Sequence, residues 1–543
     1  MTSSIDRSAS ARWMVLLGVC SAAVVLPLSF SAGAIATPAI GRALGGSPVA
    51  LNWITNAFML SFGSCLMAAG ALSDQFGRRR VFLAGIAAFA LFSLLLTIAP
   101  DIVWIDVLRG AQGIAAAGAL AGGSAALAQE FDGHAQTRAF SLLGTTFGVG
   151  LAFGPVLAGG LIEASGWRAV FASTAVIGVV ALLLAAPWMR ETRNPSAGRI
   201  DWPGIVSFTA MLCLFTVAIL EAPARGWSDP AIRALFVAAA FALAAFVAIE
   251  RRSAHPMLDL SLFRYRRFIG VQMLPIATCY CFVVLLVLLP IRFVGIDGHT
   301  PLISGLMMLA LCGPMLFVPS LAVWLTRHAS PGVVSAAGLL VSAAALVWLG
   351  RLPADATPFA MLAPMAAIGI GAGLPWGLMD GLSVSVVPKE RAGMATGIFS
   401  TTRVAGEGLA LAMVSAALSA LVSARLRAAL SSLSSLSSLS SLSSLSSLSS
   451  LSSLPSLPGI DRDRLAAAAQ QLATGDLAGA AARLPGVRAA FLREQYVDAF
   501  SLLADGLAIV TVLAALATLH YLRPDPQTAT RITNAPVPEA ADR

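Results

Sequence analysis

Charged residues are scarce in this sequence, and their scarcity limits the kinds of fold it can adopt. Asp, Glu, Lys and Arg make up 11% of the 543 residues, whereas hydrophobic residues make up 57%. A soluble domain carries about 25% charged residues, and the mean hydropathy here is +0.83. One aqueous core could not hide so much apolar surface. The composition therefore predicts a protein whose main solvent is the lipid bilayer.

The sequence has almost no lysine and no cysteine outside its apolar runs, and each of these absences argues against a class of protein. Lys389 is the only lysine, so arginine carries nearly all of the net charge of +8. These arginines fall between apolar runs instead of forming one basic face, which argues against a nucleic-acid partner. All six cysteines lie inside apolar runs, so we interpret them as packing residues and not as a disulfide framework.

The sequence also lacks the residue patterns of enzymes and ATP-driven pumps. Its five histidines are scattered, and no metal-ligand spacing or nucleophile constellation is present. Gly369, Gly371 and Gly373 are closely spaced, but no strand precedes them, as a nucleotide-binding loop would require. We therefore expect no enzymatic activity, no cofactor, no metal and no direct use of ATP.

Long apolar runs are abundant, and their lengths fit a bilayer. Such runs cover approximately residues 13–36, 52–72, 81–99, 103–127, 139–162, 168–188, 203–221, 231–250, 268–292, 302–326, 332–350, 358–383, 396–422 and 499–521. Because a hydrocarbon core about 30 Å thick needs about 20 apolar residues per helix, they predict an all-α polytopic membrane protein with about 14 transmembrane helices. The first run is longer than the apolar core of a signal peptide, so we expect it to remain attached.

The positions of the basic residues predict the orientation of these spans. An even number of spans places both termini on one side of the membrane. Arg and Lys are several times more numerous in the tails and in the loops after even-numbered spans than in the loops after odd-numbered spans. By the positive-inside rule, both termini then lie in the cytoplasm. We expect a multi-pass protein of a bacterial-type cytoplasmic (inner) membrane.

Twelve of the spans can form two pseudo-symmetric six-helix halves, with two helices inserted between them. The expected segments are a cytoplasmic tail over 1–12, an N-terminal half over 13–188, inserted helices over 203–250, a C-terminal half over 268–521, an extracytoplasmic loop over 424–498 and a cytoplasmic tail over 522–543. The loop contains a Ser-Ser-Leu repeat from Ser431 to Leu454. A period of three drifts around an α-helix, so the repeat is either a disordered or loosely helical linker or an arm that binds a partner. The alanine-rich part from Arg464 to Phe500 could form a short amphipathic helix.

The segment GALSDQFGRRR, which begins at Gly70, joins spans two and three. Asp74 lies where span two ends, and the arginines lie just before span three. The dipole of the helix in span three favours an acid such as Asp74 near its N-terminus. Gly70 and Gly77 would let the helices and the loop approach closely. We expect this loop to hold two helix ends together, although an ordinary basic loop that sets topology would look similar.

Five of these residues match a known signature. Gly70, Asp74, Gly77, Arg78 and Arg79 resemble the motif between helices two and three of the major facilitator superfamily. In that family the loop is part of a cytoplasmic gate, and its pairs are remade as two halves rock around a central site. The resemblance implies that these five residues form a gating loop.

Arg109 in span four belongs to a second resemblance. The segment RGAQG is similar to the R-x-x-Q-G signature of the family. A charged side chain facing lipid costs about 2.5–3.5 kcal/mol or more, so Arg109 should face the bundle or a wet cavity. The resemblance implies a part in proton handling, whereas a purely structural alternative is a clamp on backbone carbonyls.

Span five carries a third motif. Gly150, Gly154, Pro155 and Gly159 resemble the pattern typical of antiporters in this family, although Ala158 stands where the family usually has glycine. Proline bends the helix and glycine permits close packing. Fourteen spans with the inserted pair resemble the fourteen-helix drug:proton antiporter branch, and the likeness covers nearly the whole chain.

The match fails in span one, where the family commonly carries an acid and this chain has Ser29. A proton-driven exchanger needs a protonatable group, and Glu407 in span thirteen is the first candidate. Arg403 lies one helical turn away and could hold its charged form, or the two could form a permanent salt pair. Asp380 in span twelve is the second candidate, with a simply solvated acid as the alternative.

Six large side chains could line a tolerant apolar pocket of the kind that multidrug binders need. They are Phe147, Phe153, Trp376, Met307, Met308 and Met315. Each of them could equally face lipid or the core.

The leading hypothesis is a secondary active transporter that exports small amphipathic molecules, a drug or a toxic metabolite, by proton antiport with alternating access. An alternative is an uncoupled or differently coupled metabolite exporter of the same fold, which the missing acid favours. A third is a membrane scaffold that uses the outer loop. The expected partners are a small-molecule substrate, protons and the lipid bilayer, with a periplasmic adaptor as a further candidate.

Overall fold

The computed structural model describes residues 9–131, 133–193, 201–253, 258, 260–387, 392–442 and 462–522. These residues form helices and short connections. Fourteen helices within them are long and apolar enough to cross a membrane, which confirms the predicted all-α polytopic fold. Most of the predicted terminal tails, Lys389 and the end of the Ser-Ser-Leu repeat lie outside the described residues.

The first eight spans are single helices. They are α1 (Ala9–Leu44), α2 (Pro48–Phe76), α3 (Arg78–Thr97), α4 (Ile102–Glu130), α5 (Gly133–Ser165), α6 (Trp167–Ala185), α7 (Trp202–Arg225) and α8 (Pro230–Arg252). Several begin in the same way, with a polar residue before proline. Ser47 and Asp229 each precede a proline and accept a hydrogen bond from a first-turn backbone N–H, which satisfies a donor that the helix leaves free.

Two of the later spans are composite. The ninth consists of α9 (Arg266–Thr278), η2 (Cys279–Val283), α10 (Leu285–Pro290) and η3 (Ile291–Ile296), and the tenth of α11 (Pro301–Cys312), η4 (Gly313–Leu316) and α12 (Val318–Leu325). Both η2 and η3 are π-helical, a form that often marks functional sites. The remaining helices are α13 (Pro331–Gly350), α14 (Pro358–Ser385), α15 (Ala392–Leu442), α16 (Arg462–Ala473), α17 (Leu477–Arg483) and α18 (Ala489–Tyr521).

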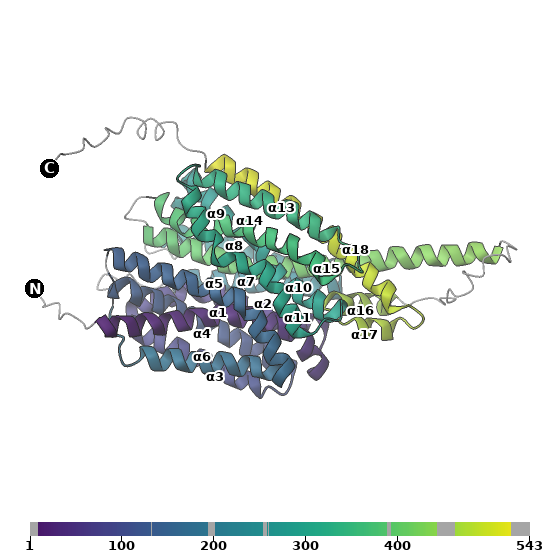
Figure 1. Cartoon of the computed structure of the whole chain (residues 1–543), viewed down its shortest axis with the longest axis horizontal. Coiled ribbons are helices and arrows are strands. Elements are labelled where there is room, and N and C mark those ends of the chain that lie inside the picture. The colour runs from purple at the N-terminus through teal and green to yellow at the C-terminus, as the bar shows by residue number, and fades with distance from the viewer. Residues whose placement is uncertain are drawn as a thin grey trace, which may run out of the picture.

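The helices pack in two groups. Helices α1–α6, here called the N half, contact one another extensively, and so do α9–α15 and α18, here called the C half. Figure 1 shows α1, α3, α4 and α6 in the lower part of the bundle and α9, α13 and α14 in the upper part. The inserted α7 packs on α8 and also contacts α2 of the N half and α15 of the C half. It therefore lies along the seam between the two groups.

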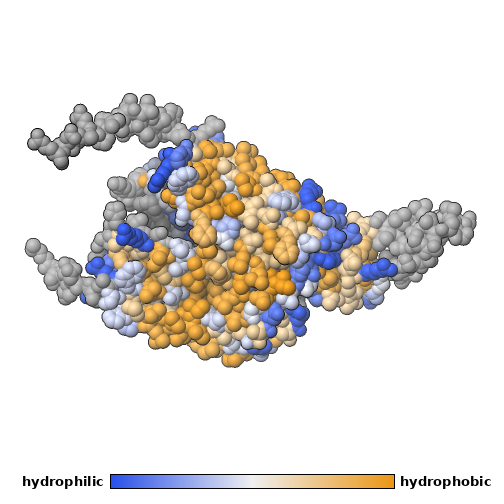
Figure 2. All heavy atoms as spheres, viewed as in Figure 1, coloured by the Kyte–Doolittle hydropathy of each residue, from blue (hydrophilic) through white to orange (hydrophobic). Residues whose placement is uncertain are grey.

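The two ends of the bundle differ. Helix α1 begins and α18 ends at the left-hand end in Figure 1, where the turn between α2 and α3 also lies, and α16 and α17 lie at the right-hand end. We call these the basic end and the α16 end. Figure 2 shows hydrophobic residues over the middle of the visible face and hydrophilic residues towards both ends. This banding is what a bilayer requires of a spanning bundle.

The predicted extracytoplasmic loop contains more structure than expected. Helix α15 is 51 residues long and projects beyond the bundle (Figure 1), so residues 431–442 of the repeat continue it. The alanine-rich part forms α16 and α17, and α18 begins at Ala489, ten residues before the predicted start of the last span. The prediction of a short helix there is confirmed, with two helices instead of one.

The seam between α2 and α15 is closed by small residues. A Cβ atom built on Gly63 of α2 would lie 2.7 Å from the Cα of Ala405 in α15. In the reverse direction, a Cβ atom on Gly408 would lie 3.3 Å from the Cβ of Met59. The backbones of the two halves can approach this closely only because glycine has no side chain.

We expect Gly63→Val to separate α2 from α15 and to reduce stability by about 1–3 kcal/mol, the usual cost of overpacking. The measurement is the apparent Tm of the purified protein in detergent. Gly406→Ala is the matched control, because a Cβ atom at Gly406 meets nothing within 4 Å. Equal Tm values for the two variants would contradict the role of Gly63 at the seam.

Candidate functional site

A cavity of about 140 Å³ lies between the two halves. The N half contributes apolar side chains to its wall, among them Phe30, Phe58, Phe62 and Phe147. The C half contributes Trp376 and, among the described lining residues, all of the charged ones, which are Asp380, Arg403 and Glu407. The cavity therefore has an apolar, aromatic wall on one side and an ionisable wall on the other.

Three residues chosen from the sequence thus meet in one place. Arg403 on α15 donates from Nη1 to Oδ1 of Asp380 on α14 across 3.3 Å, and its guanidinium lies 5.7 Å from the ring centroid of Phe399. The predicted alternative of an Arg403–Glu407 salt pair is wrong, because Arg403 reaches across to α14 instead of along its own helix. Asp380 is largely exposed and Arg403 is mostly buried.

Glu407 is consequently left as the unpaired acid of the cavity. Among the described residues, no ion pair or hydrogen bond engages its carboxyl group. It lies one helical turn beyond Arg403 on α15, towards the α16 end, and the charge of Arg403 acts on it electrostatically. A carboxyl group in this position can bind and release a proton or a cation without first breaking a salt bridge.

Arg109 on α4 lies directly behind the apolar wall. It is fully buried, and its guanidinium lies 4.3 Å from the ring centroid of Phe58, which lines the cavity. Its Nε donates to the carbonyl oxygen of Ile54 at 2.8 Å and its Nη1 to Oγ of Ser29 at 2.9 Å. Arg109 thus faces the bundle and joins α4 to α1 and α2, as both the clamp and the proton-handling interpretations require.

A polar network extends from Arg109 to α3. Its Nη1 also donates to Oε1 of Gln112 at 2.5 Å, and Nε2 of Gln112 donates to Oγ of Ser93 at 2.7 Å. Gly33 makes room for the guanidinium, because a Cβ atom there would lie 3.2 Å from Nη2. The network connects all of the first four helices through side chains that are buried in the N half.

Ser29 occupies the position where the resemblance places an acid, and it contacts Arg109 directly. The charge of Arg109 therefore has no carboxylate in hydrogen-bond contact on α1. The acid that acts on it electrostatically is Asp106, three residues earlier in α4, whose Oδ1 is buried without a hydrogen-bond partner in the described part of the chain. The sequence reasoning missed Asp106, although its i,i+3 spacing from Arg109 is a signal for such a pair.

The gating loop forms a latch inside the N half. Gly77 separates α2 from α3 with a φ of 112°, a conformation that favours glycine. Asp74 accepts from Nη2 of Arg78 at 2.9 Å, and Nη2 of Arg79 donates to the carbonyl oxygen of Ala186 beyond α6 at 3.0 Å. The loop therefore holds the ends of α2, α3 and α6 together, and these partners all belong to the N half or to the segment that follows it.

Gly70 does not behave as expected. The sequence predicts that it allows a close helix approach, but a Cβ atom built there meets nothing within 4 Å. The prediction is wrong because the last turns of α2 face open space at this residue. At Gly77, by contrast, a Cβ atom would collide with the carboxyl group of Glu191.

The glycines of the antiporter motif pack α5 against two different helices. A Cβ atom on Gly150 would lie 2.7 Å from the carbonyl oxygen of Val24, and one on Gly154 would lie 3.4 Å from the Cα of Leu28, both in α1. Nearer the α16 end, a Cβ atom on Gly159 would lie 3.0 Å from the Cα of Leu302 in α11.

The partner helix repeats this arrangement. A Cβ atom on Gly305 of α11 would lie 2.9 Å from the carbonyl carbon of Pro155. Glycines on both sides therefore bring α5 and α11, one from each half, into backbone contact towards the α16 end.

The six proposed pocket residues divide into three groups. Phe147 and Trp376 line the cavity. Met307, Met308 and Met315 are buried in the core and are not among the residues of the cavity wall. Phe153 is 51% exposed on the outside of the bundle, so its proposed place in the pocket is wrong.

Comparisons with known proteins give consistent results. The sequence profile of the Major Facilitator Superfamily matches residues 17–411. The Multidrug resistance protein Stp of Mycobacterium tuberculosis (strain CDC 1551 / Oshkosh) is 30% identical over 394 residues, which cover 72% of this chain and 73% of that protein. The Puromycin resistance protein pur8 of Streptomyces alboniger is 32% identical, with 76% and 83% covered. The Tetracenomycin C resistance and export protein of Streptomyces glaucescens is 29% identical, with 76% of each chain covered.

Solved structures agree on the fold. A bacterial homologue of the human lysosomal transporter Spinster, in an inward-facing and occupied conformation, aligns with a TM-score of 0.63 at 14% identity, covering 96% of this chain and 99% of that one. At this level of identity the likeness concerns the fold alone.

We expect Arg109→Lys to lower the free energy of unfolding by about 1–3 kcal/mol for each buried acceptor that loses its donor. Lysine has no planar fork and cannot serve Ile54, Ser29 and Gln112 together. The measurement is the apparent Tm in detergent. Arg42→Lys is the control, since the half-buried Arg42 makes one hydrogen bond, to the carbonyl oxygen of Pro38 in its own helix. A Tm loss no greater than that of the control would show that the network is not stabilising.

Proposed function

Because the chain belongs to the major facilitator superfamily and is a membrane transport protein and not an enzyme, we propose that it exports small amphipathic molecules by proton antiport with alternating access. The observation that carries the proposal is the cavity between the two halves, which combines an aromatic wall with one unpaired acid, Glu407.

The chemistry of the cavity supports an amphipathic substrate. Phe30, Phe58, Phe62 and Phe147 offer apolar surface, and Glu407 offers a negative charge or, when protonated, a hydrogen-bond donor. Three relatives are named for resistance to or export of drugs and antibiotics. A drug or a toxic metabolite with an apolar body and a polar or cationic group is the substrate class that fits this wall.

Glu407 is the residue to which we assign proton coupling. Because no salt bridge among the described residues holds Glu407, its charge state can change as the cavity faces one side and then the other, with Arg403 one turn away to stabilise the deprotonated form. Protonation favours release of a cationic substrate, and deprotonation favours its binding. Arg109 and Asp106, behind Phe58, are a second pair of ionisable groups close to the same wall.

Alternating access is supported by where the halves touch. The backbone contacts between α5 and α11 lie towards the α16 end, whereas Asp74, Arg78 and Arg79 at the basic end form their pairs outside the C half. We take the two groups of helices to be the predicted halves, residues 13–188 and 268–521, which rock about the cavity. In the opposite state the gating loop would engage the C half.

We further assign the basic end to the cytoplasm of a bacterial-type inner membrane. The first helix begins and the last one ends there, and the positive-inside rule places this end inside. The α16 end, where α16 and α17 lie, then faces outward, and a periplasmic adaptor would meet the protein on that side.

An uncoupled exporter is the second candidate, because Ser29 replaces the acid of the first span. The scaffold hypothesis has less support, since α16 packs on the bundle through α15 and α18 instead of projecting as a free arm.

We expect Glu407→Gln to abolish proton-coupled export. Inside-out vesicles with an acidified interior should release protons when ethidium is added, and the variant should lose at least nine tenths of this response, because glutamine cannot carry the proton. Glu221→Gln is the control, since Glu221 pairs with Arg225 near the end of α7, away from the cavity. If the Glu407→Gln variant transported ethidium as fast as the unmodified protein, and neither of these two released protons, the result would favour the uncoupled exporter.

We expect cysteines at the two ends to react from opposite sides of the membrane. In a variant without native cysteines, Arg327→Cys at the basic end should be protected in intact cells from a membrane-impermeant maleimide. Asp355→Cys, in the loop between α13 and α14 at the α16 end, should be labelled. The reverse pattern would invert the proposed topology.

A further inference from the structure

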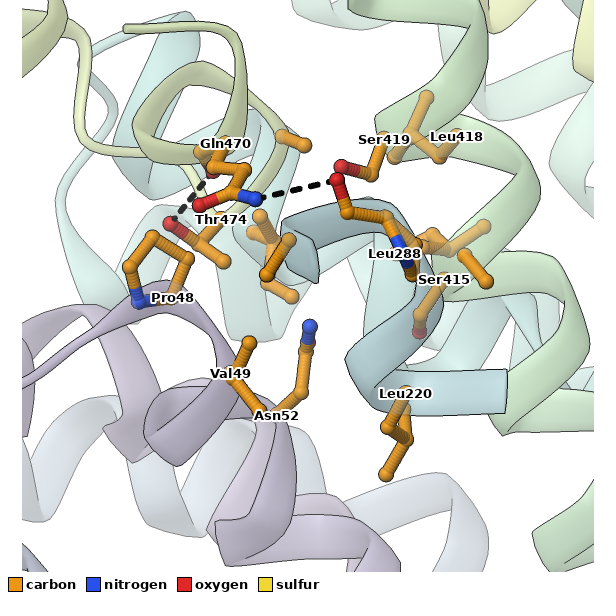
Figure 3. Close-up of a pocket in the computed structure, with 15 residues that line it drawn as sticks. Pro48, Val49, Asn52, Leu220, Leu288, Ser415, Leu418, Ser419, Gln470 and Thr474 are labelled. Carbon is orange, nitrogen blue, oxygen red and sulfur yellow. Dashed lines mark hydrogen bonds between the residues drawn. The ribbon is translucent and has the colours of Figure 1, made fainter. Parts of the chain in front are cut away.

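A second pocket lies at the α16 end of the seam between the halves. It is a closed space of about 20 Å³, lined by residues of α2, α7, α10, η3, α15 and α16 and by Thr474 in the turn after α16. Figure 3 shows Pro48, Val49 and Asn52 of α2 on one side and Ser415 and Ser419 of α15 on another. Gln470 of α16 and Thr474 in the turn after it cover it from above in this view. The pocket therefore lies between elements of both halves and beneath α16.

This pocket is in line with the central cavity, because the same helices line both. On α2, Phe58 lines the cavity and Asn52 the pocket, and on α15 the corresponding residues are Glu407 and Ser415. Spacings of six and eight residues at 1.5 Å per residue place the pocket about 9–12 Å closer to the α16 end. The contact of Gly408 with Met59 lies at the level of the cavity, which Met59 lines.

The chemistry of the pocket differs from that of the cavity. Its described polar side chains are amides and hydroxyls, and it contains no charged residue among the described lining. Ser415 and Ser419 are 9% and 8% exposed, and neither hydroxyl nor the side-chain amide of Asn52 has a partner in the described part of the chain. Such groups can bind water or the uncharged polar part of a molecule, and they lack the charge that would retain a cation.

The α16–α17 segment covers the pocket and belongs to the C half. Helix α16 packs on α15 and also contacts α18, α2 and α7. Nε2 of Gln470 donates to the carbonyl oxygen of Pro223 at 3.3 Å. Pro223 is in the last turn of α7, where carbonyl groups have no partner within the helix. The contact of α16 with α2 therefore crosses the seam, and its contact with α7 reaches the helix that lies along the seam.

The turn after α16 sits on the π-helical stretch η3. Gly475 has a φ of 83°, and its Cα lies 2.6 Å from where a Cβ atom of Gly295 would be, so two glycines allow the contact. A buried ion cluster fixes η3 to α18. Nη2 of Arg493 on α18 lies 3.0 Å from Oδ1 of Asp297, and Nε of Arg292 lies 3.3 Å from its Oδ2.

Charge clusters of this kind are costly to break, because each removed partner leaves a buried charge. The segments η3 and α18 should therefore move as one body, and α16 and α17 should move with them.

We propose that this pocket is the release vestibule of the transporter and that α16 and α17 form its lid. When the halves part at the α16 end, the lid stays with the C half and separates from α2, so that the cavity opens through the vestibule. This inference deepens the proposed function and rests on alternating access, but it does not depend on proton coupling. A substrate that leaves the charged cavity meets only uncharged groups, which favours its release.

A reversible crosslink between the lid and α2 tests the proposal. Val49→Cys and Thr474→Cys, in a variant without native cysteines, would be joined by a short bis-methanethiosulfonate. Ethidium export should fall at least tenfold and recover when the link is reduced. Gln471→Cys with Arg483→Cys is the matched control, because these residues pair inside the lid, with Nε of Arg483 2.9 Å from Oε1 of Gln471, and linking them leaves the seam free. Full export by the Val49–Thr474 crosslinked protein would overturn the lid.

A second experiment needs no transport and so separates failure of the lid from failure of the proposed function. Ser419→Cys would be labelled by a membrane-impermeant maleimide in cells. Gln470→Ala, which removes the hydrogen bond to α7, should raise the labelling rate several-fold, and Gln471→Ala, which removes a bond within the lid, should not. Equal labelling rates in all three backgrounds would overturn the proposal, whereas faster labelling without any ethidium export would retain the lid and reject the exporter.

Discussion

The free-energy cost of placing an ionised side chain among apolar groups determines how this bundle is organised. A charged residue within a span must face a partner or water, because the hydrocarbon of the bilayer does not solvate an ionised side chain. Arg109 meets this demand with a backbone carbonyl, Ser29 and Gln112, and Arg292 meets it with Asp297. Glu407 meets it differently, by facing the cavity. Some charges of the spans thus hold helices together, whereas Glu407 faces the cavity without a salt bridge among the described residues.

Close approach between helices follows from small residues at a few positions. The hydrophobic effect contributes little to helix association within lipid, so the favourable free energy comes from close packing of the helices. Gly63 and Gly408 bring α2 to α15, and Gly159 and Gly305 bring α5 to α11. Both contacts join one half to the other. Such interfaces can close tightly without side chains that interlock.

Much of the site can be predicted from the sequence, and the predictions that fail do so for a common reason. Arg109, Glu407, Arg403 and Asp380 were selected because charges are rare in apolar runs, and the last three meet at one cavity. The sequence places Arg403 within reach of its helical neighbour Glu407, on which its charge acts, but does not predict that its salt bridge is with Asp380 on α14. Asp106 was missed, and Phe153 was placed inside although it faces outward. Each error concerns a contact or a face that depends on neighbouring helices.

The sequence by itself determined the number of spans, the helical class and the family, because hydropathy over about 20 residues and short motifs are local properties. Only the tertiary structure decided which acid remains unpaired, which glycines carry close contacts, and where α16 and α17 sit. These outcomes depend on which helices become neighbours, and residues as distant in the chain as Gln470 and Pro223 meet only after the bundle has formed. Two side chains interact when they are close in space, and their separation along the chain does not reveal whether they are.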